Sequence, residues 1–77
     1  MTIHGELGSG SFVPWIGRHS AKLGLDQIVW RRDADRIVLD VAGPVELIDM
    51  LEMGCLLGPI DVWVEMIRRE PIGHGGA

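Results

Sequence analysis

The chain has 77 residues, of which 47% are hydrophobic and 23% charged, and its seven basic and eleven acidic side chains give a formal net charge of −4. A chain this short forms one domain with a single modest core, and its negative charge argues against a general DNA- or RNA-binding protein. It lacks both a signal peptide and an apolar run of the roughly 20 residues that cross a bilayer, so we expect a soluble, cytoplasmic protein.

The first third of the chain predicts a strand, a loop of small residues and a helix. Residues 3–7 form a short strand that runs into the glycine and serine loop of residues 8–11. From Phe12 onward the apolar residues recur with the i, i+3, i+4 spacing of an amphipathic helix. Ser11 is the natural N-cap of this helix, and Gly24 supplies its left-handed end.

The middle of the chain predicts a β-hairpin. Residues 27–31 and 36–42 are rich in Ile and Val, which is typical of strands. The short polar turn between them implies that the two strands pair antiparallel.

The last third predicts a second helix and a final strand. The helix opens at Gly43 and Pro44, because the missing N–H of proline costs least there, and it ends at Gly58. Its buried stripe comprises Leu47, Ile48, Leu51 and Cys55. Residues 62–67 form the final strand.

This order of elements predicts an α+β fold of the ferredoxin-like βαββαβ type, a four-stranded antiparallel sheet with two helices on one face. Residues 1–71 are assigned to this domain and residues 72–77 to a flexible C-terminal tail that has nothing to bury. The fold by itself implies no function.

Five short markers resemble the acylphosphatase family, and they occur in the family's order without a gap between Gly5 and about Ile67. The family has a glycine-rich loop ending in arginine, a helix ending in L-G-L, a strand close to G-W-V-R-N, and G-P at two later points. The corresponding residues are Gly5 to Val13, then Leu23, Gly24 and Leu25, then Gln27 to Arg31, then Gly43 and Pro44, and finally Gly58 and Pro59.

The resemblance implies hydrolysis of the carboxyl-phosphate bond of acyl phosphates, without a metal or cofactor. In the family, the loop and its arginine hold the phosphate, and the asparagine of the second strand orients the attacking water. Here the two catalytic positions carry Val13 and Arg31. Valine has no donor, and arginine cannot accept a hydrogen bond from water. Our leading hypothesis is therefore an acylphosphatase-like protein that is impaired or inactive.

Phosphate or anion binding could outlast the loss of turnover, because backbone N–H groups at a helix start attract anions. The candidate phosphate-binding residues are Gly8, Ser9, Gly10, Ser11, Phe12 and Arg31. In one hypothesis Arg31 reaches the loop; in the other it is a solvated residue paired with Asp33 or Asp35. A one-residue slip in the second strand would change which arginine faces the loop.

Two alternatives stay open. One is an active acylphosphatase in which Arg31 or Arg18 binds the phosphate. The other is a small protein-interaction module or homodimer that uses a sheet edge or a tryptophan-bearing sheet face. Trp30 and Trp63 lie on the predicted second and last strands, whereas Trp15 is expected in the core.

The histidines and the cysteine do not indicate a metal site. His4, His19 and His74 lack metal-ligand spacing with one another and with Cys55. The single cysteine sits in an apolar run, so we expect it to be a small buried hydrophobic residue.

Overall fold

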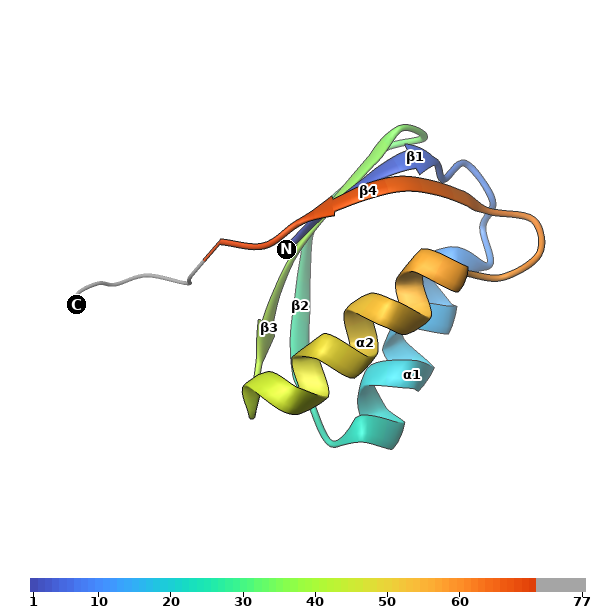
Figure 1. Cartoon of the computed structure of the whole chain (residues 1–77). Coiled ribbons are helices and arrows are strands. Elements are labelled where there is room, and N and C mark those ends of the chain that lie inside the picture. Colours follow the sequence, from blue (N-terminus) through green and yellow to red (C-terminus); the bar gives the residue numbers. More distant parts are fainter. Residues whose placement is uncertain (71–77) are drawn as a thin grey trace.

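A computed structural model describes residues 1–70 of the chain (Figure 1). Its elements are β1 (Thr2–Glu6), α1 (Phe12–Leu23), β2 (Asp26–Arg32), β3 (Arg36–Ala42), α2 (Val45–Leu57) and β4 (Trp63–Arg68). All six predicted elements are present in the predicted order. The predicted tail, residues 72–77, lies outside the described residues.

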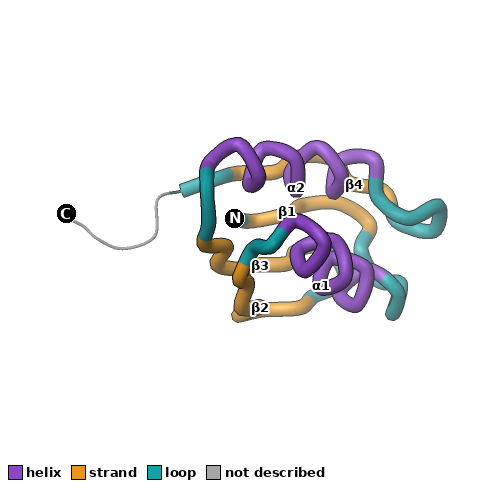
Figure 2. Tube along the Cα trace, turned by 90° about the horizontal axis from the view of Figure 1, so that it is seen from below, coloured by secondary structure: helices purple, strands orange, loops and turns teal. Residues whose placement is uncertain are grey.

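The four strands form one antiparallel sheet in the order β2-β3-β1-β4. Figures 1 and 2 show both helices on the same side of this sheet, with α2 beside β4 and α1 on the side of β2. The opposite face of the sheet carries no helix of the described chain. The α+β class is therefore confirmed.

The core lies between the sheet and the two helices, as the alternation of buried residues in β3 requires. The fully buried large side chains are Ile3, Phe12, Ile16, Ile37, Leu39, Leu51 and Cys55. Trp15 is half-buried and packs against this cluster. Burial, with the nearby Glu52 carboxylate, raises the pKa of the Cys55 thiol to about 12, so this cysteine is an unreactive core residue as predicted.

Helix α1 begins and ends at the residues that the sequence predicts, but the predicted side-chain cap at its N-terminus is not formed. Gly24 ends the helix in the left-handed region, with φ 74° and ψ 24°. Ser11 stands at the N-cap, but its side chain makes no capping hydrogen bond, so that part of the prediction is wrong. The Ser11 hydroxyl donates instead to Asp61, which lies fifty residues later in the chain.

Strand β2 contains one more residue than the stretch of β3 it faces. Val29 pairs with Leu39, but the next pair in the ladder joins Arg31 to Val38. Trp30 is therefore the extra residue of a β-bulge. Because side chains alternate between the faces of a sheet, one inserted residue reverses the face of every residue that follows it.

The bulge decides the directions of the two arginines that end β2. Arg32 pairs with Ile37, whose side chain is buried under the helices, so Arg32 lies on the helix side. Arg31 lies on the open face. Trp30 lies there too, and its indole Nε1 donates to Asp40 Oδ2 at 2.6 Å, which ties the bulged residue to β3.

A second irregularity brings β1 close to β4 at Gly5. A Cβ atom at this position would lie 2.1 Å from the carbonyl oxygen of Trp63 and 2.9 Å from Cα of Val64. Both are backbone atoms of the neighbouring strand, so no side-chain rotation can relieve the overlap.

Replacing Gly5 should therefore force β1 and β4 apart. We expect Gly5→Ala to lower the free energy of unfolding by about 1–3 kcal/mol, the usual cost of overpacking. Gly10→Ala is the matched control, because no atom lies within 4 Å of the added methyl group there. Urea unfolding measures the stability of both variants. Equal stability of Gly5→Ala and Gly10→Ala would contradict the close approach of β1 to β4 at Gly5.

Candidate functional site

The glycine and serine loop after β1 faces the turn between β2 and β3 across a cavity of about 350 Å³. Two backbone hydrogen bonds hold these segments together: Gly5 N–H donates to the Asp35 carbonyl at 3.2 Å, and Leu7 N–H donates to the Ala34 carbonyl at 2.6 Å. The cavity wall includes Gly8, Ser9, Gly10, Val13, Arg32 and Asp33. The cavity therefore lies where the sequence places the candidate site, between the loop and the end of the second strand.

Only some of the predicted site residues line this cavity. Gly8, Ser9, Gly10 and Val13 do. Ser11 is turned to Asp61, and Phe12 is fully buried in the core. The first half of the loop is thus the part that faces the cavity.

Arg31 does not line the cavity, and Arg32 does. The Nε of Arg31 donates to Asp33 Oδ2 at 2.5 Å, in an exposed ion pair that matches one of the two hypotheses for this residue. Arg32 makes no ion pair within residues 1–70. The sequence gives one indication of a role for Arg32, which is that it directly follows Arg31. A one-residue insertion earlier in the strand therefore turns Arg32, instead of Arg31, toward the loop.

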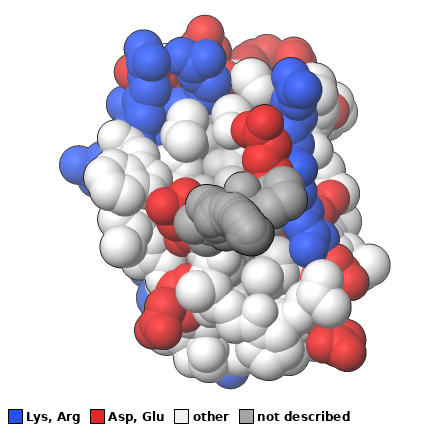
Figure 3. All heavy atoms as spheres, turned by 90° about the vertical axis from the view of Figure 1, so that its left-hand side faces the viewer, with Lys and Arg blue, Asp and Glu red and all other residues white. Residues whose placement is uncertain are grey.

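The cavity wall carries one positive and one negative side chain, Arg32 and Asp33. In Figure 3, which views the molecule from the left-hand side of Figure 1, Lys and Arg side chains lie among Asp and Glu side chains at the top, where Figure 1 places the β2–β3 turn. Arg32 contributes one positive charge to the cavity wall, and the negative charge of Asp33 is balanced by Arg31. An anion that enters would meet one guanidinium and a half-buried valine, Val13.

The two serine hydroxyls of the loop bind a carboxylate of the same chain. Ser9 Oγ donates to Asp61 Oδ2, and Ser11 Oγ donates to the same carboxylate at 3.1 Å. These bonds tie the loop to the connection between α2 and β4. Hydrogen bonds that favour the ionised form lower the pKa of Asp61, with Ser9 as the largest cause.

The backbone N–H groups of the loop fall into two sets, those with a hydrogen-bond partner and those without one among residues 1–70. The N–H groups of Ser11 and Phe12 donate to Ser9, at 3.3 Å to its Oγ and at 3.5 Å to its carbonyl. Those of Gly8, Ser9 and Gly10 have no hydrogen bond within residues 1–70. The backbone donors without a partner among residues 1–70 therefore belong to the three loop residues that line the cavity.

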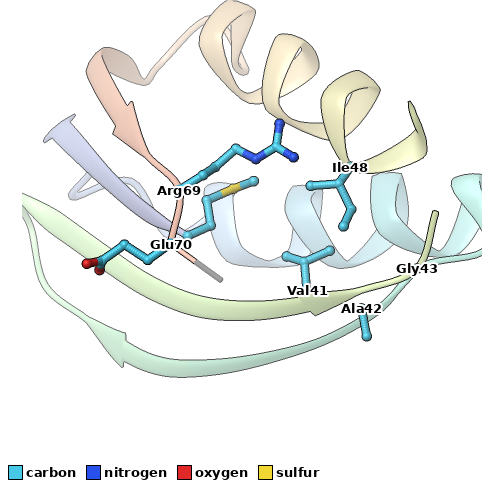
Figure 4. A pocket seen from close by; sticks show the side chains of 7 residues that line it. Val41, Ala42, Gly43, Ile48, Arg69 and Glu70 are labelled. Atoms are coloured by element: carbon cyan, nitrogen blue, oxygen red, sulfur yellow. The ribbon is translucent and has the colours of Figure 1, made fainter. Parts of the chain in front are cut away.

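A larger cavity of about 440 Å³ lies between α2 and the end of β3, and its chemistry is different (Figure 4). Val41 and Ile48 point into it from the two elements. Its one cationic side chain, that of Arg69, forms ion pairs with Asp49 and with Glu52, the latter at 3.1 Å. With apolar walls and a neutralised cation, this cavity is a poor anion site.

The Asp61 contacts generate a test of the loop geometry. We expect Ser9→Ala to raise the pKa of the Asp61 carboxyl and Ser11→Ala to raise it less. A lowered pKa in the folded state stabilises the protein above the unfolded-state pKa, and this stability is lost as the pH falls through the folded-state pKa. Ser9→Ala should therefore weaken the dependence of stability on pH in the acid range.

Carbon-detected NMR titration of the aspartate carboxyls measures the effect directly. Thr2→Ala, on β1, is the control and should leave Asp61 unchanged. An Asp61 titration identical in wild type and Ser9→Ala would show that the hydroxyl does not bind this carboxylate in solution.

Residues 1–70 contain no group of three or more His, Cys, Asp and Glu side chains placed to hold a metal ion. No helix among them is both long enough and apolar enough to span a membrane. Comparisons with models of protein families, with curated proteins and with solved structures give no match.

Proposed function

We propose that this chain is an acylphosphatase-like domain of the ferredoxin-like fold that binds small phosphate-type anions weakly and does not hydrolyse acyl phosphates. The βαββαβ order and the sheet order β2-β3-β1-β4 support the fold. The loop and G-P markers of the sequence support the family resemblance. A cytoplasmic location belongs to the same proposal, and the single, unpaired Cys55 supports it.

The observation that carries the proposal is the make-up of the loop–turn cavity, whose wall combines Val13 and Arg32 with the glycine loop. Valine cannot neutralise a phosphoryl oxygen. A guanidinium can, but it has only donors and cannot hold an attacking water through an accepted hydrogen bond. Removal of one positioned electrostatic group typically costs about 10²–10³ in rate, and losses within one catalytic unit are not additive.

Anion binding has a physical basis in the same residues. The guanidinium fork of Arg32 matches two oxygens of a phosphate, and the N–H groups of residues 8–10 lie just before the start of α1. Asp33 and the net charge of −4 oppose binding. We therefore expect a dissociation constant on the order of 1 mM for inorganic phosphate, or weaker.

The active-enzyme alternative would need Arg31 or Arg18 in the cavity. Arg31 lies on the open face and pairs with Asp33, and Arg18 is an exposed residue of α1 that does not line the cavity. The geometry therefore favours the inactive domain.

An interaction module is the second candidate function, and the open sheet face favours it. Ile28, Trp30, Trp63 and Met66 are all about half exposed or more, with Trp30 at 66% and Trp63 at 67%. Exposed tryptophans supply large apolar contact areas at protein interfaces. This function is compatible with anion binding, because the loop–turn cavity lies elsewhere.

Phosphate binding is testable with a matched pair of arginine variants. In an NMR titration of the wild type with phosphate at constant ionic strength, we expect the amide signals of Gly8, Ser9 and Gly10 to shift. Arg32→Gln should abolish these shifts, whereas Arg18→Gln, at an exposed residue of α1 outside the cavity wall, should preserve them. Loss with Arg18→Gln alone, or no shift in the wild type, would contradict the assignment of the anion site.

Turnover is tested with acetyl phosphate as substrate. The wild type should hydrolyse it no faster than buffer. The double variant Val13→Arg with Arg32→Asn places the family's two side chains at the positions that face the cavity, and its rate should exceed that of the wild type about tenfold or more. The control is Val13→Arg with Arg31→Asn, which should stay lower. Wild-type turnover that Arg32→Gln abolishes would overturn the proposal.

A further inference from the structure

The turn between α2 and β4 holds the Asp61 carboxylate against the loop in front of α1. Ser9 Oγ and Ser11 Oγ both donate to this carboxylate, the latter at 3.1 Å to each of its oxygens. Val62 N–H donates to the Pro59 carbonyl at 3.1 Å, and the Val62 side chain is buried in the core. The residue after Asp61 is therefore anchored, so the backbone of the turn as well as the two hydroxyls fixes the carboxylate at the loop.

This carboxylate brings a negative charge to the start of α1, which has none of its own. Helix α1 contains no acidic residue in its first turn, and its N-cap residue, Ser11, makes no capping hydrogen bond through its side chain. The N–H groups of a first turn carry partial positive charge, which a nearby anion stabilises. Because Asp61 is bound to Ser11, it provides that anion from a distant part of the chain.

The proposed anion site uses the same loop. Ser9 lines the loop–turn cavity and also carries one of the hydroxyls that bind Asp61. A serine hydroxyl has a single O–H donor, and Ser9 gives it to the carboxylate. A phosphate in the cavity would therefore lie near a charge of its own sign and would find the Ser9 donor already taken.

We propose that Asp61 is an internal competitor that lowers the affinity of the loop–turn cavity for phosphate-type anions. It acts through charge repulsion and by occupying the Ser9 hydroxyl, although it does not itself line the cavity. This role rests on the anion site proposed above, and it attributes part of the weakness of that site to one side chain.

Two other acidic residues near the cavity differ from Asp61 in their contacts. Asp33 lines the cavity, but its carboxylate is paired with Arg31. Asp35 binds the segment before the loop through its backbone carbonyl, which accepts from Gly5 N–H. Among residues 1–70, Asp61 carries the carboxylate that accepts hydrogen bonds from the side chains of the loop.

The experiment compares the dissociation constants of inorganic phosphate for the wild type and two Asp61 variants. The amide shifts of Gly8, Ser9 and Gly10 report binding at fixed pH and ionic strength. Asp61→Asn keeps the size and one acceptor oxygen but removes the charge, and it should bind phosphate roughly threefold more tightly or better, because unit charges several ångströms apart in water repel by an energy on the order of RT. Asp61→Glu keeps the charge and should stay near the wild type.

Asp26→Asn is the matched control for net charge. Asp26 is exposed and begins β2, opposite Ala42, whereas the cavity lies at the other end of that strand. Its replacement removes the same single charge and should leave the phosphate affinity nearly unchanged. Amide spectra that match the wild type outside the substituted regions verify that each variant is folded. A purely structural role of Asp61 predicts the opposite sign, since a loosened loop would bind phosphate more weakly.

Equal phosphate affinity of the wild type and Asp61→Asn would overturn the competitor role and leave the proposed function intact. Weaker binding by Asp61→Asn, or an equal gain in Asp26→Asn, would also overturn it. Shifts that appear in Asp61→Asn and not in the wild type would support the competitor role and contradict phosphate binding by the wild type. The absence of shifts in every variant would overturn both.

Discussion

The bulge at Trp30 is the constraint on which the candidate site and the open face depend. One inserted residue keeps Val29 opposite Leu39 and moves Arg31 opposite Val38, so the two arginines at the end of β2 exchange faces. The cavity beside the glycine loop receives Arg32 in consequence. Arg31, on the other face, is free to form its ion pair with Asp33.

The loop that faces this cavity serves two purposes at once. Gly8, Ser9 and Gly10 line the cavity, while the hydroxyls of Ser9 and Ser11 bind the Asp61 carboxylate. The two serine hydroxyls bind an anionic group, the Asp61 carboxylate, that belongs to the same chain. The loop therefore has a structural role in holding Asp61 that does not require phosphate chemistry.

Much of the fold was predictable from the sequence, and the reasons are local. Apolar spacing marks α1 and α2, Ile and Val mark β2 and β3, and Gly24 marks a helix end through its left-handed backbone. The bulge was not predictable, because strand periodicity does not reveal a single inserted residue. The role of Ser11 was missed for a related reason: its partner Asp61 lies fifty residues away, and only the tertiary fold brings them together.

The pairing of β2 with β3 is the most direct test of this account, and nuclear Overhauser effects between backbone protons of the two strands measure it. The account predicts contacts that pair Arg31 with Val38 and Arg32 with Ile37. Contacts that pair Trp30 with Val38 and Arg31 with Ile37 would show a regular strand without a bulge. They would return Arg31 to the helix side and contradict the assignment of Arg32 to the cavity.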